Sequence, residues 1–431
     1  MLAIRTGGAA RGLLPCDNNF MTESPEPKSP LPLACEVLVL GAGPAGSACA
    51  QTLAQQGWDV VLVDQHDFPR DKVCGDGLIP DAHRALQRLG VAEEVRSRAH
   101  PVPHVRCFSP SGRHVDVPGE LAVLPRRELD HILVRAAQRA GAALYTPWRL
   151  ESLIRDGDRV VGARLVGKGG TASVHAGHVV LATGASAQPL QASGLCTRRS
   201  PSAMALRGYV YHPSLQPSMP HLQVVWHRRL APGYGWIFPC GQGRFNIGVG
   251  IIDSHHHRHG RKREVNLRQV LDDFMALHPS ARVLAQEGQW LGPPKGAPLR
   301  SSLAGAVVAA PGVLVTGEAA GSTYAFTGEG IGKALETGIL AAQALHMART
   351  ERWDEPALAA HYRAQLAVLQ PKFDLYEKGN RINYHPWLTQ LLIWRASRSP
   401  RLQQRMASVL EERATPAHLI TARGLYRLFV E

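Results

Sequence analysis

The sequence predicts an α/β protein with a discontinuous Rossmann-like domain for a dinucleotide, an inserted domain built on an antiparallel sheet, and a helical C-terminal tail. Three observations support this fold class. A glycine-rich turn at 41–46 joins an apolar strand to a helix, stretches of alternating polarity follow one another within 198–292, and a second glycine-rich turn at 317–321 follows another apolar strand. Because two nucleotide-type turns lie so far apart, we expect two separated segments to hold one long cofactor.

The first turn belongs to a complete β-turn-α-β unit. An apolar run leads into Gly-Ala-Gly-Pro-Ala-Gly at 41–46, a helical pattern follows, and a second apolar strand ends at Asp64. Gly41 permits the tight turn, Gly43 lets the backbone approach a pyrophosphate, and Gly46 lets the helix pack on the strand. A carboxylate in the place of Asp64 accepts hydrogen bonds from a ribose. The order of these parts favours a dinucleotide site over a turn that serves packing alone.

The composition is typical of an enzyme with more than one domain. The chain has 431 residues, and 45% of them are hydrophobic, which is enough for two or three domains with large cores. No apolar run is long enough to span a membrane, and seven scattered cysteines predict reduced thiols and a cytoplasmic setting. The net charge of +13 comes without a nucleic-acid-binding motif, so we expect no nucleic-acid partner. We attribute the charge to solubility, to attraction of an anionic cofactor and to affinity for a membrane surface.

Two segments are expected to take no part in the chemistry. Residues 1–33 are rich in Gly, Pro, Ser and Asn without periodicity, which predicts a disordered extension, with Met21 as an alternative start to Met1. The histidines within 255–259 cannot all face one metal ion, so a solvated loop is favoured there and no metal site is predicted.

Basic residues beyond the first unit are placed to meet an anion. The loop at 68–78 precedes a helical pattern at about 81–89. Its glycines allow close approach to a flat ligand, and Arg70 and Lys72 can meet phosphate or the negative charge of a reduced flavin. A plain surface loop is the alternative interpretation. Arg126 opens a later helix and is also placed for an anion.

The next segments are predicted to be mainly strands. A strand-like region covers 105–117, and a β-meander covers 142–180. The meander ends in a strand at 179–181, after which Gly184 turns the chain back toward the cofactor. Alternating polarity within 198–292 predicts antiparallel strands with one buried face.

The second glycine-rich turn is expected to complete the cofactor site. Glu318 in this turn would place a carboxylate on ribityl hydroxyls. The run Thr-Gly-Glu-Gly-Ile at 327–331 starts a helix that reaches about Met347. The N–H groups at the start of that helix would face the pyrimidine end of a flavin ring.

Four motifs in this order resemble the FAD-dependent geranylgeranyl reductase family, within the para-hydroxybenzoate-hydroxylase-like flavoproteins. The resemblance covers roughly Cys35 to Leu345. The motifs are G-A-G-P-A-G at 41–46, K-V-C-G-D-G-L at 72–78, P-G-Y-G-W-I-F-P at 232–239 with N-I-G-V-G at 246–250, and G-E-A-A-G through G-E-G-I at 317–331.

The resemblance implies FAD as the cofactor and gives each motif a role. Cys74 would lie beside the flavin ring as the candidate catalytic residue. Aromatic side chains of the third motif would line the substrate pocket, namely Tyr234, Trp236 and Phe238. The cofactor-binding residues would be Gly41, Gly43, Pro44, Ala45, Gly46, Asp64, Gln65, Lys72, Cys74, Gly75, Arg126, Gly184, Gly317, Glu318, Gly328, Gly330 and Ile331. The usual Gly-Asp pair of the family is Gly317-Glu318 here, so we expect the backbone to lie slightly farther from the ribityl hydroxyls.

The activity that the resemblance implies is reduction of carbon–carbon double bonds in an isoprenoid or another long, apolar substrate. The flavin N5 would deliver a hydride to one alkene carbon and an acid would protonate the other. No second G-x-G-x-x-G follows a strand, so NAD(P)H would bind transiently, and a ferredoxin-like protein is the other candidate donor. The alternatives are an aromatic monooxygenase, a halogenase-like enzyme of secondary metabolism and a non-enzymatic flavin-binding module.

The expected domains follow from these segments. Residues 34–197 and 293–350 form the FAD-binding domain, 198–292 the substrate domain, and 351–431 the helical tail. Around Trp387 the tail mixes an apolar helical face with arginines. This face either packs against the flavin domain or lies on an anionic membrane, which would make the protein a peripheral one at the membrane surface.

Overall fold

The computed structural model describes residues 30–196, 198, 200–252, 257–258, 261–262 and 265–414. The chain divides into two units, Met1–Leu31 and Pro32–Glu431, and the second is described below. Most of the predicted disordered extension lies outside the described residues. The same holds for most of the predicted histidine loop, of which β14 (His257–Arg258) and β15 (Arg261–Lys262) are described as a short antiparallel pair.

The first sheet has a parallel core, as expected of a Rossmann-like domain. β1 lies between β2 and β9 and pairs with both in parallel, while β6 extends the sheet beyond β2 and β19 extends it beyond β9. The residues of β2 are all buried, which is typical of a parallel strand covered on both faces. The strands are β1 (Ala34–Leu40), β2 (Val60–Val63), β6 (Ala143–Tyr145), β7 (Trp148–Asp156), β8 (Arg159–Gly167), β9 (Gly170–Leu181), β18 (Ala309–Ala310) and β19 (Val313–Val315).

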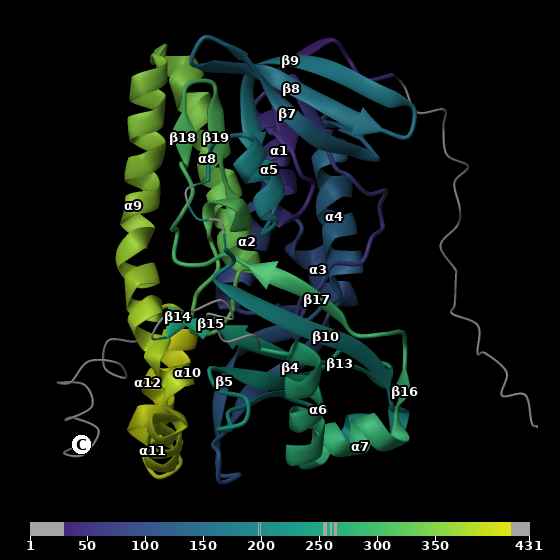
Figure 1. Ribbon diagram of the computed structural model, residues 1–431, viewed down its shortest axis with the longest axis vertical. Helices are drawn as coiled ribbons and strands as arrows, with labels where there is room; N and C mark the ends of the chain where they lie inside the picture. The colour runs from purple at the N-terminus through teal and green to yellow at the C-terminus, as the bar shows by residue number, and fades with distance from the viewer. Residues whose placement is uncertain are drawn as a thin grey trace, which may run out of the picture. The chain divides into compact units, whose positions relative to one another are not determined.

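The predicted meander is present as β7, β8 and β9, which pair antiparallel in this order. Helices α1 and α8 pack on each other beside this sheet, with α4 next to α1 and α9 next to α8 (Figure 1). Their bounds are α1 (Pro44–Gln55), α4 (Arg126–Arg139), α8 (Ile331–Glu351) and α9 (Glu355–Gly379). Helix α1 begins at Pro44, inside the glycine-rich turn, because proline suits the first helical position, where no N–H is needed.

Close approach between helices brings the two glycine-rich turns together. A Cβ atom added at Gly338 in α8 would lie 2.2 Å from the backbone oxygen of Ala45 in α1. One added at Gly317 would lie 2.5 Å from the Ala45 Cβ atom. Any larger residue at either position would push α8 and the second turn away from α1. The late segment of the chain therefore returns to the β-turn-α-β segment that carries the first glycine-rich turn, as predicted.

The second sheet is mostly antiparallel and carries α6 (Leu267–Leu277) and α7 (Pro279–Glu287) on one face. A Cβ atom added at Gly235 would lie 2.6 Å from the ring of Phe274 in α6, so this side of β12 faces the helices. Tyr234, Trp236 and Phe238 alternate with it and face the opposite side. The strands are β3 (Gly77–Leu78), β4 (His100–Phe108), β5 (His114–Val123), β10 (Ala203–Tyr211), β11 (Leu222–Val225), β12 (Gly233–Pro239), β13 (Arg244–Ile252), β16 (Gln289–Trp290) and β17 (Lys295–Leu299).

The strand-like region at 105–117 differs from the expectation in two respects. It is an antiparallel pair, β4 and β5, with a turn held by the Ser109 N–H bond to the Arg113 oxygen. This pair lies within the segment expected to belong to the FAD-binding domain, yet β4 pairs in parallel with β11 of the second sheet. The second sheet is therefore built from two separated segments of the chain.

The C-terminal tail is helical, as predicted. Its first helix, α9, packs on α8 and β18 of the flavin domain, whereas its last two helices pack on β5 of the second sheet. Ile393 and Leu402 form an apolar cluster with Val115 and Val117 of β5, whereas the side chain of Trp387 is 64% exposed. None of the helices among the described residues is long and apolar enough to cross a membrane. The remaining helices are α2 (Pro80–Arg88), α3 (Ala92–Arg98), α5 (Ala187–Ala192), η1 (Pro213–Ser218), η2 (Gly317–Ala320), α10 (Arg381–Tyr384), α11 (Pro386–Ala396) and α12 (Pro400–Leu410).

Candidate functional site

The first glycine-rich turn leaves space where a pyrophosphate is expected. Added Cβ atoms would collide with the Ala182 oxygen at Gly41 and with the Gly41 oxygen at Gly46, at 2.3 and 1.7 Å. At Gly43, by contrast, the nearest atoms are guanidinium nitrogens of Arg70 and Arg126, 3.8 and 4.0 Å away. The turn is therefore closed on its inner side and open on the side that faces two cations and the N-terminus of α1. A diphosphate group fits this arrangement.

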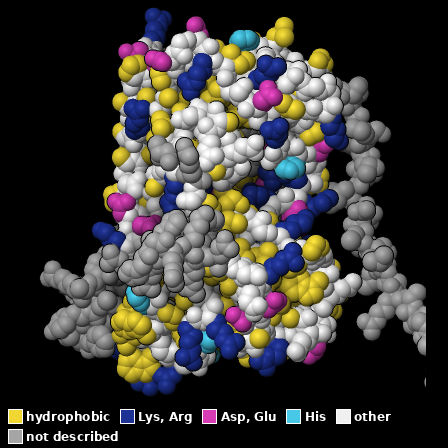
Figure 2. All heavy atoms as spheres, viewed as in Figure 1, with side chains coloured by type: hydrophobic (Ala, Val, Ile, Leu, Met, Phe, Trp, Pro, Cys, Tyr) yellow, Lys and Arg dark blue, Asp and Glu magenta, His cyan; other side chains and the backbone are white. Residues whose placement is uncertain are grey.

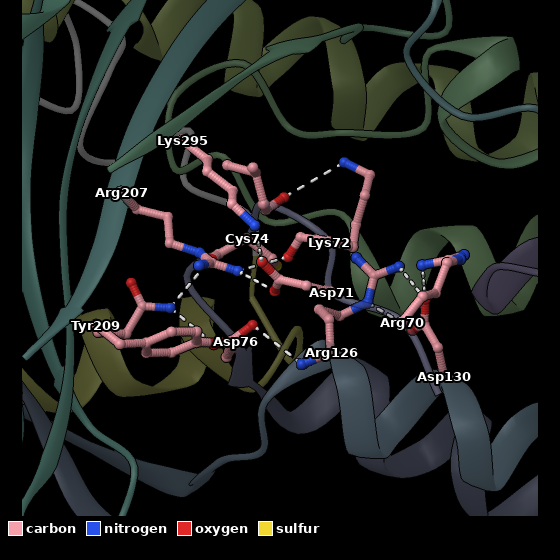
Figure 3. A network of polar contacts seen from close by, with 12 residues as sticks. Arg70, Asp71, Lys72, Cys74, Asp76, Arg126, Asp130, Arg207, Tyr209 and Lys295 are labelled. Carbon is pink, nitrogen blue, oxygen red and sulfur yellow. Dashed lines mark hydrogen bonds and ion pairs between the residues drawn. The ribbon is translucent and has the colours of Figure 1, made fainter. Parts of the chain in front are cut away.

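The two arginines are held in place by one buried carboxylate (Figure 3). Asp130, fully buried in α4, accepts hydrogen bonds from Nε and Nη2 of Arg126 at 2.6 and 2.9 Å and from Nη1 of Arg70 at 3.0 Å. Burial opposes the charge of Arg126, but Asp130 raises its pKa overall. Each guanidinium group has more N–H donors than Asp130 accepts from, so donors are left for an anionic ligand.

Asp64 lies at the end of β2, as predicted, and its carboxylate is turned toward the glycine turn. Its Oδ2 atom accepts from the Ala42 N–H at 2.9 Å, and its Oδ1 atom accepts from the His66 N–H at 3.0 Å. Arg70 lies 3.6 Å away. These contacts fix the carboxylate at the cavity wall beside Gln65. Hydrogen bonding of Asp64 to a ribose remains a prediction.

A polar cluster ties the loop that carries Cys74 to the second sheet. Asp76 is fully buried at φ +66° and accepts from Tyr209 Oη at 2.5 Å and from Asn246 Nδ2 at 2.7 Å. The same Nδ2 atom donates to the Cys74 oxygen at 2.7 Å, while Asn246 Oδ1 accepts from Trp236 Nε1 at 3.0 Å. Asn246 therefore links the loop to the predicted substrate pocket.

Two of these residues were not predicted to matter, although both stand in quoted motifs. Asp76 is the aspartate of C-G-D-G, and Asn246 is a polar residue within an apolar strand. Burial raises the pKa of Asp76 to about 6, and the bond from Tyr209 opposes this rise. A polar residue within an apolar strand was the available signal, because buried polar groups need partners.

The outer part of the same loop is bound by cations of the second sheet (Figure 3). Arg207 in β10, 3% exposed, donates to Asp71 Oδ1 at 2.7 Å and to the Lys72 oxygen at 2.9 Å. Lys295 of β17 lies 3.4 Å from Asp71. The loop predicted to bind cofactor is thus held at both ends by the second sheet.

The second turn lies against the first and is shaped by glycines. Gly317 has φ +65°, and its N–H donates to Thr337 Oγ1 at 3.0 Å. Glu318 accepts from Thr323 Oγ1 at 3.3 Å. Helix α8 begins at Ile331, as predicted, so its free N–H groups face the same space.

All but two of the predicted site residues line one cavity of about 590 Å³. The exceptions are Gly46 and Gly317, which permit close packing around it. The volume lies within the usual range for small-molecule sites. On the face seen in Figure 2, Lys and Arg side chains lie around a hollow between the parts that carry the two sheets.

The cavity changes in character along its length. Its middle is aromatic, with ring centroids of Tyr234 lying 5.8 Å from Trp226 and 6.3 Å from Trp236. Its far wall is apolar and includes Val117 of β5 and residues of α11 and α12. Those helix residues were not predicted as site residues, and they are Leu392, Ile393, Leu402, Met406, Val409 and Leu410.

Comparison with known proteins gives consistent matches. Residues 34–365 match the model of the FAD binding domain family. A menaquinone reductase of Mycolicibacterium smegmatis is 35% identical over 321 residues, which cover 72% of this chain and 75% of that protein. A digeranylgeranylglycerophospholipid reductase of Methanosarcina mazei is 29% identical over 325 residues, covering 73% and 75%. These matches agree with the resemblance that the four motifs carry.

Solved structures share the fold. A geranylgeranyl bacteriochlorophyll reductase-like protein from Thermoplasma acidophilum has a TM-score of 0.70 at 22% identity, covering 92% of this chain and 96% of that one. A flavin-dependent brominase has a TM-score of 0.69 at 19% identity, covering 92% and 98%. The predicted fold class is thereby confirmed, while identities this low carry no further conclusion about activity.

Proposed function

We propose that this chain, which belongs to the FAD binding domain family and is an FAD-binding oxidoreductase, reduces carbon–carbon double bonds of a long, apolar, isoprenoid-type substrate. The observation that carries the proposal is the continuity of one cavity from the open glycine turn to an apolar end lined by α11 and α12. Relatives named as reductases of menaquinone and of a digeranylgeranyl lipid support this substrate class.

The residues of the chain would divide the work along this cavity. Gly43, Arg70 and Arg126 would hold the pyrophosphate, Asp64 the adenosine ribose and Glu318 the ribityl hydroxyls. FAD, when bound, supplies two-electron hydride chemistry.

The second sheet would supply the substrate end. Tyr234, Trp236 and Phe238 would orient an alkene beside Cys74 and Gly75, where an added Gly75 Cβ atom would lie 3.1 Å from the Phe238 ring. Their apolar surfaces exclude water from the reacting alkene and help to fix its position.

Anaerobic re-oxidation of the flavin tests this function. The FAD-loaded protein is reduced with dithionite and mixed with isoprenoid alkenes, among them a menaquinone and a digeranylgeranyl lipid. We expect the oxidised flavin spectrum to return in proportion to saturated product measured by mass spectrometry. Re-oxidation by oxygen alone, with a hydroxylated or halogenated product, would assign the protein to the monooxygenase or halogenase alternative instead.

The electron donor is proposed to be NAD(P)H bound transiently at the cationic hollow, with a ferredoxin-like protein as the other candidate. Stopped-flow reduction of the bound FAD by NADPH, NADH and reduced ferredoxin separates these donors. A rate of flavin reduction that saturates with the concentration of NADPH or NADH would support NAD(P)H as the donor.

We further propose peripheral association with an anionic membrane, which would deliver an insoluble substrate. Trp387 is 64% exposed at the start of α11, and Arg398 and Arg401 are exposed between the end of α11 and the first turn of α12. Co-sedimentation with anionic vesicles should fall at high salt and in a variant that combines Trp387→Ser, Arg398→Gln and Arg401→Gln. Equal binding by this variant and the wild type would exclude the surface as the membrane contact.

A further inference from the structure

The short loop before α8 holds one carboxyl group firmly at the cavity wall. Gly328, at φ +72°, is packed so that an added Cβ atom would lie 2.7 Å from Tyr234 Oη. At Gly330 the corresponding atom would lie 2.6 Å from Thr323 Oγ1. The backbone of this loop is held by Tyr324, whose N–H donates to the Glu329 oxygen at 2.9 Å and whose oxygen accepts from the Gly328 N–H at 2.9 Å, and the Glu329 side chain lines the cavity.

The position of Glu329 lies between the two halves of the site. Ile331, two residues later, begins α8, whose N-terminus is expected to face the flavin ring. Tyr234 comes from the aromatic wall of the second sheet and donates to the Thr327 oxygen of the same loop. A carboxyl group on this loop lies next to both the expected cofactor and the expected substrate.

Behind this loop lies a buried cluster of charges. Lys333, 4% exposed, lies 3.7 Å from Asp81 and 3.1 Å from Glu412. Lys372 lies 2.6 Å from Glu412, and Glu412 reaches the surface at Arg84, 2.7 Å away. The two lysines are therefore engaged by other carboxylates of the cluster.

These surroundings keep Glu329 protonated at neutral pH. Burial first, and then the negative charge of Asp81, raise the pKa of Glu329 to about 8. Glu412 behaves in the opposite way, because Lys333 and Lys372 outweigh its burial and lower its pKa to about 2. Burial also raises the pKa of the Cys74 thiol, so that group is protonated as well. A carboxyl group with a pKa near the working pH is the better proton donor of the two.

We propose that Glu329 is the general acid of the alkene reduction. The inference rests on the proposed function. One alkene carbon accepts a hydride from the reduced flavin, which is thereby oxidised, and the other carbon takes the proton of the Glu329 carboxyl group. Two C–H bonds form, the C=C π bond breaks, and the carboxylate that remains takes a proton from solvent. The titratable groups that face Glu329 are Asp81, Tyr234, Lys372, Tyr376 and Glu412.

The first test compares Glu329→Gln with Glu329→Asp and with Glu336→Gln. Glu336 is a carboxylate of α8 that pairs with Lys333 and does not line the cavity. With FAD bound and reduced, we expect anaerobic re-oxidation by the alkene to slow by about 10²- to 10⁴-fold in Glu329→Gln and less in Glu329→Asp. In the wild type and in Glu336→Gln the rate should fall as the pH rises through about 8. That decline should be absent in Glu329→Gln.

The second test needs neither flavin nor turnover. A protonated carboxyl group in apolar surroundings gives its own C=O stretching band in the infrared spectrum. In the flavin-free wild type this band should disappear as the pH is raised through about 8, and it should be missing in Glu329→Gln. A wild type without such a band overturns the proposal, even where Glu329→Gln fails to hold FAD.

An unchanged re-oxidation rate with an unchanged pH profile in FAD-loaded Glu329→Gln also overturns it. If no alkene re-oxidises the wild type, the proposed function fails, and the acid role fails with it. The infrared band then still reports whether Glu329 is a neutral acid, so the two failures are told apart.

Discussion

Gly43 is the residue at which the structure separates cofactor binding from folding most clearly. An added Cβ atom there meets no protein atom closer than the guanidinium ends of Arg70 and Arg126, so we expect the flavin-free fold to tolerate Gly43→Val. The valine methyl groups would occupy the space open to a pyrophosphate, and we expect the purified variant to lose its yellow colour and non-covalent FAD. The measurement is FAD released per protein on heating, with the thermal midpoint of the flavin-free form as reference.

Gly46→Ala is the matched control for that prediction. Its Cβ atom would lie 1.7 Å from the Gly41 oxygen, so this variant should lower the thermal midpoint itself. Full flavin occupancy in Gly43→Val would show that the turn does not hold the cofactor.

Cys74 is the residue predicted from the resemblance to be catalytic, and its role remains a proposal. Cys74→Ala removes the thiol beside the expected flavin ring, and Cys74→Ser keeps a similar shape. We expect kcat to fall several-fold in Cys74→Ala, with the decline above about pH 8 retained because it belongs to Glu329. Loss of the fall in kcat above about pH 8 in Cys74→Ala would indicate that Cys74, and not Glu329, is the acid. Unchanged turnover in both variants would leave it a packing residue.

Among single residues, the sequence predicted those whose role follows from the local geometry of the backbone. The glycines at 41–46 and the carboxylate of Asp64 follow from local geometry that any dinucleotide turn requires. The protonated state of Glu329 could not be predicted, because it depends on burial and on Asp81 from a distant helix. The same holds for Asp76, whose partners come from β10 and β13.

Among the elements, the loop at 70–78 depends on the second sheet for its position. Asn246→Leu leaves Asp76 with one side-chain partner fewer and leaves the Cys74 oxygen and Trp236 Nε1 without theirs. We expect the free energy of unfolding to fall by about 1–3 kcal/mol, since buried polar groups lose their bonds. We also expect weaker FAD binding.

Urea unfolding and a flavin titration measure the two effects. Tyr209→Phe removes one hydrogen bond to Asp76 while keeping the ring. It should therefore lower the free energy of unfolding and the affinity for FAD less than Asn246→Leu does. Equal FAD affinity in Asn246→Leu and wild type would argue against a positioning role.

Two buried histidines make the second sheet sensitive to acid. His278 Nε2 lies 2.8 Å from Gln223 Oε1, and the His221 ring stacks on His104 at 4.9 Å. Burial lowers the pKa of His278 and of His221 to about 4. The unfolded chain binds these protons near pH 6.5 and the folded chain does not, so stability should be full above about pH 6.5 and fall as the pH drops toward 4.

Thermal unfolding between pH 6.5 and 4 checks whether stability falls with falling pH, as expected. His278→Gln keeps a hydrogen-bonding group toward Gln223 and cannot become charged, so its midpoint should fall less steeply with acid than that of the wild type. A steeper fall would contradict the assignment.

Most helices and strands were predictable from their own patterns, whereas their partners were not. The strands β10 to β13 were predicted to be antiparallel, and they pair in this way, but β12 and β13 are largely buried on both faces instead of one. Nothing local shows that β4 pairs with β11, because that contact joins segments far apart in sequence. The apolar face of α11 likewise predicted a buried face but not that β5 would cover it.

On the scale of the whole unit, two sheets and the C-terminal helices enclose one cavity, and its apolar end should set the length of the substrate. Met406 of α12 lines that end. Met406→Asp places a charge there, so we expect KM to rise at least tenfold for long isoprenoid chains and to change little for short ones. Affinity for FAD should stay the same, because the flavin site lies at the other end.

A series of substrates of increasing chain length measures this dependence. An equal rise in KM for all lengths would mean that the charge disturbs the whole site rather than the far end of a long substrate. Unchanged KM throughout would place the substrate elsewhere.

The order in which the chain is synthesised gives the split cofactor site a further consequence. The first turn leaves the ribosome early, but β19, the second turn and α8, against which α1 packs at Ala45, are translated only after the whole second sheet. Until then the nascent chain exposes the apolar face of α1 and lacks one wall of the flavin site. We therefore expect FAD to bind only after the segment that forms the second sheet and α8 has been synthesised. A chain stalled before Ile331 should depend on chaperones to stay in solution.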